Sequence, residues 1–93
     1  MVVFILERVP TSAKGELSRW MVQPKSGVFV GHVSARVRDL IWDRIVRGLK
    51  RGAAVLVFTS NEEPGYTIRT FGDTQRVMQD YDGLALPKTR ISS

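Results

Sequence analysis

The stretch Gly27–Gly52, GVFVGHVSARVRDLIWDRIVRGLKRG, contains the longest helical pattern of the chain. A β-rich run at 28–33 leads into a predicted helix at about 34–51, with Ser34 as its N-cap and Gly52 as its C-cap. Apolar residues recur along one side of this helix, and six of the chain's 14 Lys and Arg residues lie on it. The stretch therefore predicts a helix with one core-facing side and one basic side.

Strand patterns surround this helix. The apolar runs at 2–8 and 53–59 are typical of strands buried on both faces, and the alternating run at 66–71 would form a hairpin with the second of them. A shorter helix, capped by Thr11 or Ser12, is expected to reach about Val22 with Trp20 on its apolar stripe, before a loop at 24–27. With a last short strand at 84–86, this order predicts an α+β plait, one sheet with two helices on one face.

Composition narrows the class of protein. The 93 residues are enough for one small domain, and without cysteine neither a disulfide framework nor a thiolate metal site can form, as expected in the cytoplasm. The apolar run at 2–6 is too short to span a membrane and lacks the flanks of a signal peptide. A net charge of +5 favours a polyanionic partner such as nucleic acid, although the charge could serve solubility alone.

Catalytic motifs are sparse. The chain has no P-loop, nucleophile elbow or dinucleotide-binding glycine pattern, and its single histidine, His32, argues against a zinc site or a Ser-His-Asp triad. Glu7, at the end of the first strand, is the most interesting acid, because two copies of it in a dimer could share a divalent cation. One carboxylate per chain is fewer than the two or more ligands that metal nucleases normally need, however. The adjacent Arg8 would also weaken cation binding. Three further carboxylates are more typical of turns than of metal sites: Asp73, Asp80 and Asp82.

Four basic residues lie near the predicted ends of elements: Lys14, Arg36, Arg38 and Arg76. A helix N-terminus already favours phosphate, and cations placed there can follow a nucleic-acid backbone. Such contacts give affinity without reading the sequence. The alternative is that these residues form an ordinary solvated surface.

Several motifs resemble those of a known family, the small CRISPR-associated spacer-acquisition proteins called Cas two, in the type I-E (Escherichia coli) subtype. The most specific is the block from Gly27 to Trp42, which reads GVFVG-x-VSARVR-x-x-IW. The resemblance covers essentially the whole chain at similar length. It also rests on shorter runs, which are Glu7-Arg8-Val9-Pro10, Arg19-Trp20, Thr70-Phe71-Gly72 and Asp82-Gly83-Leu84.

This resemblance implies a ferredoxin-like fold, with a mainly antiparallel sheet and an extra C-terminal strand, in a core domain at 1–83. It implies a homodimer that acts as a scaffold, holds prespacer duplex DNA and bridges two integrase dimers. The family's backbone-binding basic positions correspond to Lys14, Arg36, Arg38 and Arg76, whereas Ser12 and Gln75 stand where relatives carry further arginines. The segment at 84–93 would dock on the integrase subunit through Leu84, Ala85, Leu86 and Ile91.

The wider family also suggests an alternative, a nuclease that depends on Mg²⁺ or Mn²⁺. The family's catalytic aspartate ends the first strand, where this chain has Glu7, which would be both catalytic residue and metal ligand. His32 replaces an aspartate that is common after the glycine, and both departures weaken the nuclease hypothesis. The scaffold needs no cofactor. A generic RNA-binding plait is a third possibility, but the strand at 66–71 lacks the clustered aromatics of such modules.

Overall fold

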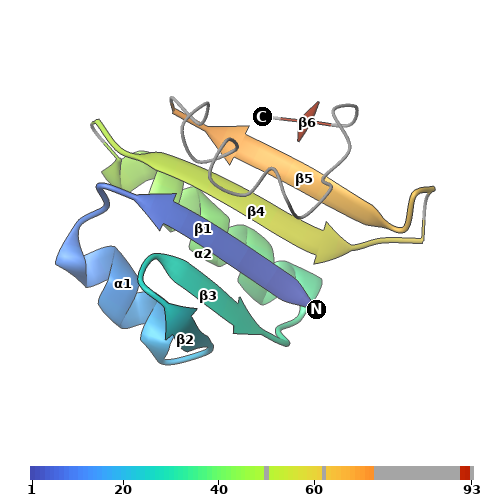
Figure 1. Ribbon diagram of the computed structural model, residues 1–93, viewed down its shortest axis with the longest axis horizontal. Helices are drawn as coiled ribbons and strands as arrows, with labels where there is room; N and C mark the ends of the chain where they lie inside the picture. Colours follow the sequence, from blue (N-terminus) through green and yellow to red (C-terminus); the bar gives the residue numbers. More distant parts are fainter. Residues whose placement is uncertain (50, 62, 73–90, 93) are drawn as a thin grey trace.

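The computed structural model describes residues 1–49, 51–61, 63–72 and 91–92, and its strands form one sheet in the order β2-β3-β1-β4-β5-β6 (Figure 1). The two helices lie behind this sheet in the view of Figure 1. In chain order, the elements are β1 (Val2–Glu7), α1 (Thr11–Ser18), β2 (Val22–Lys25), β3 (Val28–Gly31), α2 (Ala35–Gly48), β4 (Ala53–Thr59), β5 (Tyr66–Phe71) and β6 (Ile91–Ser92).

The first four strands and the two helices make the predicted ferredoxin-like plait. The element order β1-α1-β2-β3-α2-β4, with β1 and β3 side by side in the sheet, is the split βαβ arrangement. Every pair from β2 to β5 is antiparallel, including the predicted β4–β5 hairpin. The α+β fold class is therefore confirmed. A strand near the C-terminus, β6, pairs in parallel with β5 through Ile68 and Ile91, whereas the strand predicted at 84–86 lies outside the described residues.

Alternation along the strands divides the apolar side chains between the two faces of the sheet. The larger cluster packs between the sheet and the helices and includes the fully buried Phe4, Leu17 and Phe29. A smaller cluster, centred on Val55 and Ile68, lies on the other face. β1 and β4 contribute to both clusters, which explains why their sequences are continuously apolar, as predicted for strands buried on both faces.

The first helix is shorter than predicted, and the strand β2 was missed. α1 starts at Thr11 with Pro10 as its N-cap, so the expected cap by Thr11 or Ser12 is wrong. The helix ends at Ser18, and Trp20 is 51% exposed instead of lying on the apolar stripe. β2 then occupies part of the predicted loop. Because β2 is an edge strand, Pro24 can lie in it although it has no N–H to donate.

The start of α2 was predicted correctly and its end was not. The Ser34 side chain caps the helix by accepting a hydrogen bond from the Val37 amide at 3.2 Å. The helix stops at Gly48, since Leu49 is already extended, with φ −81° and ψ 130°. Gly52, predicted as the C-cap, has a different role. A Cβ there would lie 2.5 Å from the Arg8 carbonyl oxygen, so the glycine allows the chain to pass the end of β1.

Candidate nucleic-acid interface

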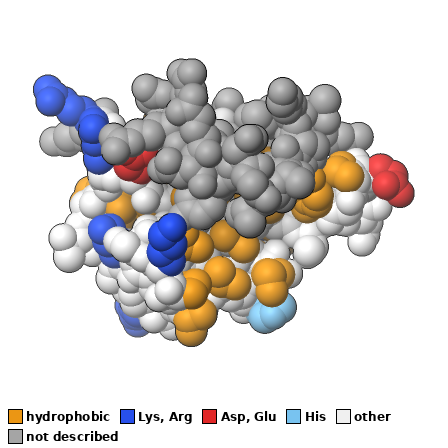
Figure 2. Space-filling view, in the orientation of Figure 1, with side chains coloured by type: hydrophobic (Ala, Val, Ile, Leu, Met, Phe, Trp, Pro, Cys, Tyr) orange, Lys and Arg blue, Asp and Glu red, His pale blue; other side chains and the backbone are white. Residues whose placement is uncertain are grey.

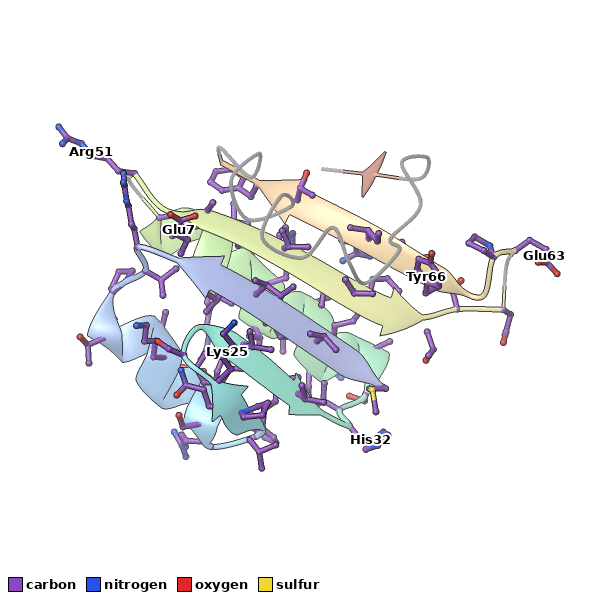
Figure 3. All side chains as sticks on the ribbon, viewed as in Figure 1. Glu7, Lys25, His32, Arg51, Glu63 and Tyr66 are labelled. Atoms are coloured by element: carbon purple, nitrogen blue, oxygen red, sulfur yellow. The ribbon has the colours of Figure 1, made fainter. Side chains whose placement is uncertain are left out.

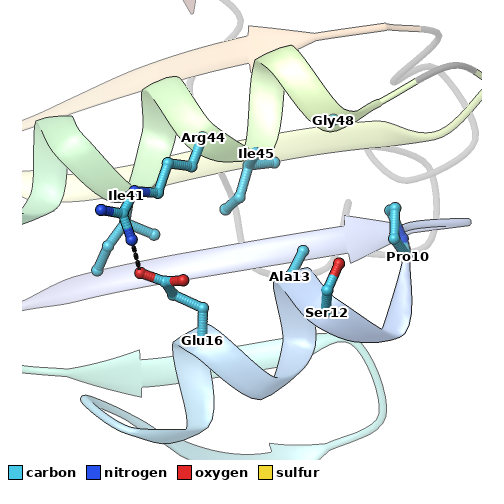
Figure 4. A pocket seen from close by; sticks show the side chains of 8 residues that line it. All are labelled: Pro10, Ser12, Ala13, Glu16, Ile41, Arg44, Ile45 and Gly48. Carbon is cyan, nitrogen blue, oxygen red and sulfur yellow. Dashed lines mark hydrogen bonds and ion pairs between the residues drawn. The ribbon is translucent and has the colours of Figure 1, made fainter.

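Lys14 and Arg36 lie at opposite ends of the helix layer. α1 and α2 run antiparallel, because Ala13 lines the same small cavity as Gly48, while Glu16, further along α1, pairs with Arg44 (Figure 4). Lys14 therefore lies near the C-terminal end of α2, and Arg36 lies in the first turn of that helix. At 1.5 Å per residue, the 12 residue steps from Arg36 to Gly48 span about 18 Å, or about five base-pair steps of 3.4 Å. The two residues do not form one compact patch.

Arg38, also predicted to bind nucleic acid, is packed against the protein. Its guanidinium lies 3.7 Å from the centroid of the Phe58 ring, and its Nε donates to Asp39 Oδ1 at 2.9 Å. Arg69, on β5, donates to the same carboxylate oxygen at 2.9 Å and approaches the same ring at 5.1 Å. The Arg38 side chain is only 14% exposed. Of the predicted contacts that the structure describes, Arg38 is thus the least available.

The carboxylate between these two arginines is electrostatically stabilised. The hydrogen bond from Arg38 lowers the pKa of Asp39 below its ordinary value, with a smaller contribution from Arg69, although desolvation works in the opposite direction. Asp39 is therefore ionised at neutral pH. It connects α2 to β5 and neutralises part of the positive charge at that place.

The middle of α2 is neutralised as well. Arg44 pairs with Glu16 of α1, across a cavity of about 140 Å³ between the helices, and Arg47 pairs with Asp43 at 3.0 Å, the predicted i,i+4 pair. The cavity has an apolar floor at Ala13, Ile41 and Ile45. Much of the predicted basic side of α2 therefore consists of ion pairs on the surface.

Two exposed arginines that were not predicted as contacts lie at the same end as Lys14. Arg8 follows β1 and Arg51 precedes β4, and the close passage at Gly52 brings the two segments together. Figure 3 shows Arg51 and Glu7 at this end of the sheet, with the Arg51 side chain extending outward. Neither arginine forms an ion pair with another described residue. A positive φ of 57° at Arg8 marks the sharp turn, which the Arg-Val-Pro sequence alone did not reveal.

Glu7 lies where it was predicted, at the end of β1, opposite Ala53 in the sheet register. Its surroundings do not suit a divalent cation, because Arg8 is adjacent and Arg51 lies at the same end of the sheet. Among the residues that the structure describes, no three His, Cys, Asp or Glu side chains gather as metal ligands. The described residues of a single chain therefore do not fit Mg²⁺ or Mn²⁺, which prefer several oxygen ligands.

The remaining predicted residues are described in part or not at all. Arg76, Leu84, Ala85 and Leu86 lie outside the described residues. Ile91 begins β6 and is paired with Ile68 of β5 in the sheet register. His32 is exposed after β3, as expected for a loop residue. In the described ranges, no helix is both long and apolar enough to cross a bilayer.

The fold and this surface define a small α+β plait in which Lys14 and Arg36, near opposite ends of the helix layer, form no ion pair with another described residue. Comparison with protein families adds the identity of the group: residues 1–86 match the family model described as "CRISPR-associated protein (Cas_Cas2CT1978)". This match covers most of the chain, so the protein belongs to that CRISPR-associated family. It is therefore a Cas2-like protein with a CRISPR-related role.

Proposed function

We propose that the protein is a homodimeric scaffold for spacer acquisition, of the type I-E subtype, which holds prespacer duplex DNA and bridges two integrase dimers. Membership of the CRISPR-associated family supports the general role, and the motif block in 27–42 supports the subtype. The observation that carries the DNA-binding part is the placement of cations without a carboxylate partner among the described residues, with Lys14 at one end of the helix layer and Arg36 at the other.

This arrangement suits contact with DNA phosphates. Backbone contacts fix the position of a duplex without reading its sequence, which a protein that handles spacers of any sequence requires. Lys14 lies near the C-terminal end of α2, which is about 18 Å from Arg36 along that helix, so the two side chains can touch separate phosphates of one duplex. A dimer repeats both contacts and so extends the track along the DNA.

The alternative, a Mg²⁺- or Mn²⁺-dependent nuclease, depends on Glu7. Metal-assisted hydrolysis of a phosphodiester needs carboxylates that hold the cation and leave room for substrate. One chain supplies Glu7 beside Arg8, and the described residues offer no cluster of further ligands. We therefore favour the scaffold and use Glu7 to separate the two functions.

A reconstituted reaction tests this choice. The protein is mixed with its integrase partner and a DNA duplex, and spacer insertion is measured for wild type, Glu7→Ala and the double variant Lys14→Ala/Arg36→Ala. We expect normal insertion with Glu7→Ala and strongly reduced insertion with the double variant. Arg47→Ala is the matched control, because Arg47 is already paired with Asp43. Loss of insertion in Glu7→Ala, with DNA binding intact, would support the nuclease instead.

The docking role proposed for residues 84–93 needs a separate test. A chain that ends at Gly83 should still bind duplex DNA and should no longer co-elute with the integrase in gel filtration. Because this truncation also removes β6, circular dichroism must show that the plait is retained. Unchanged co-elution would place the integrase contact elsewhere on the protein.

A further inference from the structure

An open groove lies at the β2 edge of the sheet, away from the paired arginines. Its volume is about 480 Å³, within the range of ligand-binding clefts. Figures 2 and 3 show His32 at this edge, beside hydrophobic side chains. The groove is lined by Ser18, Arg19, Trp20, Met21, Val22, Val30, Gly31 and His32.

Backbone hydrogen bonds hold the turn that carries Trp20 at this groove. The Trp20 amide donates to the Leu17 carbonyl at 3.0 Å, and the next amide, that of Met21, donates to the same oxygen at 2.9 Å. The Met21 side chain is buried in the core and anchors the turn. A Cβ at Gly31 would lie 2.9 Å from Met21 Cγ and 3.2 Å from the Trp20 carbonyl oxygen, so the glycine lets β3 approach this turn closely.

The exposed side chains of the groove share one kind of chemistry. Trp20 is 51% exposed, and Arg19 and His32 are exposed as well. Indole, imidazole and guanidinium are the planar groups on which proteins stack unpaired nucleobases. No carboxylate is among the described residues that line the groove, so nothing there repels a phosphate. An acidic peptide would use the positive charge but would not require three planar groups.

We propose that this groove is a stacking site for unpaired nucleotides of a single-stranded nucleic acid, with Trp20 as the platform and Arg19 and His32 beside it. This inference rests on the proposed function in one respect only, namely that the ligand is a nucleic acid. It goes further because the bases inside a duplex cannot reach an exposed indole, whereas unpaired nucleotides can. Duplex contact at Lys14 and Arg36 and base stacking at Trp20 are therefore separable.

Fluorescence can isolate Trp20, because the chain has only two tryptophans and Trp42 packs against Phe4, with ring centroids 6.5 Å apart. In a Trp42→Phe background, a single-stranded oligothymidylate of about eight nucleotides should quench the remaining emission as it binds. Trp20→Ala should weaken binding of the same probe, followed by anisotropy of a dye on its end, by about 5- to 100-fold. Trp20→Phe should restore part of that loss.

Three comparisons make this test specific. Leu40→Ala removes another exposed apolar side chain, 53% exposed on α2 and outside the groove, and should leave oligothymidylate binding unchanged. Duplex affinity should be unchanged in Trp20→Ala and reduced in Lys14→Ala/Arg36→Ala. If Lys14→Ala/Arg36→Ala keeps its duplex affinity, the proposed duplex-binding function fails, whereas the stacking site is judged separately by oligothymidylate binding. The unfolding temperature of Trp20→Ala should match that of wild type, because Trp20 is exposed and its removal leaves the core intact.

Three results would overturn the stacking site. One is equal oligothymidylate affinity in wild type and Trp20→Ala. Another is quenching by a polyglutamate peptide as strong as by the oligonucleotide, which would mean that the groove takes an acidic peptide. The third is Trp20 emission that acrylamide cannot quench in the protein alone, which would mean that a second copy of the chain covers the groove.

Discussion

Basic residues occur both in the middle of α2 and at the ends of the helix layer, but the two regions differ in whether these residues form ion pairs. In the middle, Arg44 and Arg47 pair with Glu16 and Asp43. At the ends, Arg36 and Arg51 are exposed and form no ion pair with the other described residues. The formal charge of a helix therefore does not show where a polyanion can bind. The cations that matter are those whose hydrogen bonds and charge are not already used by a carboxylate.

Arg38 and Arg69 show a third state, in which two cations lie on one aromatic ring and share one carboxylate. Phe58 provides the ring, and Asp39 provides the charge. This cluster joins α2 to β4 and β5, so we assign it to stability. Three substitutions test these assignments: Phe58 and Asp39 belong to this cluster, and Gly52 lies at the basic end of the molecule. They follow in order of decreasing effect on the free energy of unfolding.

Phe58→Ala should have the largest effect. Phe58 is 8% exposed and lies in the main core, and both guanidinium groups lie over its ring. Its removal leaves a cavity and should lower the free energy of unfolding by about 3–5 kcal/mol. Chemical denaturation measures this change, with Leu40→Ala, an exposed apolar residue, as the control. A loss below about 1 kcal/mol would show that the ring is not a core element.

Gly52→Ala should have an intermediate effect at the basic end of the molecule. The added methyl group would lie 2.5 Å from the Arg8 carbonyl oxygen and 2.6 Å from that of Glu7, and backbone atoms cannot move away easily. We expect a loss of about 1–3 kcal/mol of unfolding free energy. Gly15→Ala is the matched control, because nothing lies within 4 Å of its Cβ position in α1, and alanine there should stabilise the protein by up to about 1 kcal/mol.

Asp39→Asn should have the smallest effect, and that effect should depend on pH. The pKa of Asp39 is lowered in the folded protein, so its charge stabilises the fold above the unfolded pKa, and this contribution disappears as the pH falls through the lowered value. Because this carboxylate is half-exposed, the loss at neutral pH should be about 0.5–1 kcal/mol.

Urea unfolding of wild type and Asp39→Asn at pH 7 and in strong acid checks the sign of this dependence. The difference in unfolding free energy should be largest at neutral pH and should vanish in acid. A difference that grows as the pH falls would contradict the ion-pair account of Asp39.

Most of the fold could be predicted because hydrophobic periodicity reports burial directly. The continuous runs of β1 and β4 and the Ser34 cap are local patterns with one strong interpretation. β2 could not be predicted in this way, because Val22–Lys25 is exposed along its length and owes its strand geometry to pairing with β3. Trp20 was placed on the helix stripe since its spacing fits, but α1 ends two residues earlier.

The site was harder to predict than the fold. Sequence shows that Arg36 and Arg38 begin a helix, yet it cannot show that Arg38 turns onto Phe58, a residue of another element. Likewise, Arg8 and Arg51 are far apart in the chain and lie at the same end of the sheet only because β1 and β4 are neighbours in it. Ion pairs between elements, such as Glu16 with Arg44, have the same origin, whereas the local pair Asp43–Arg47 was predictable.

The salt dependence of duplex affinity tests the central claim most directly. The slope of log K against log salt should fall in magnitude by about two for Lys14→Ala and for Arg36→Ala, because each removes one phosphate contact from both subunits of the dimer. It should stay unchanged for Arg47→Ala, whose guanidinium is held by Asp43 at 3.0 Å. An unchanged slope for both end variants, or an equal fall for Arg47→Ala, would contradict the account.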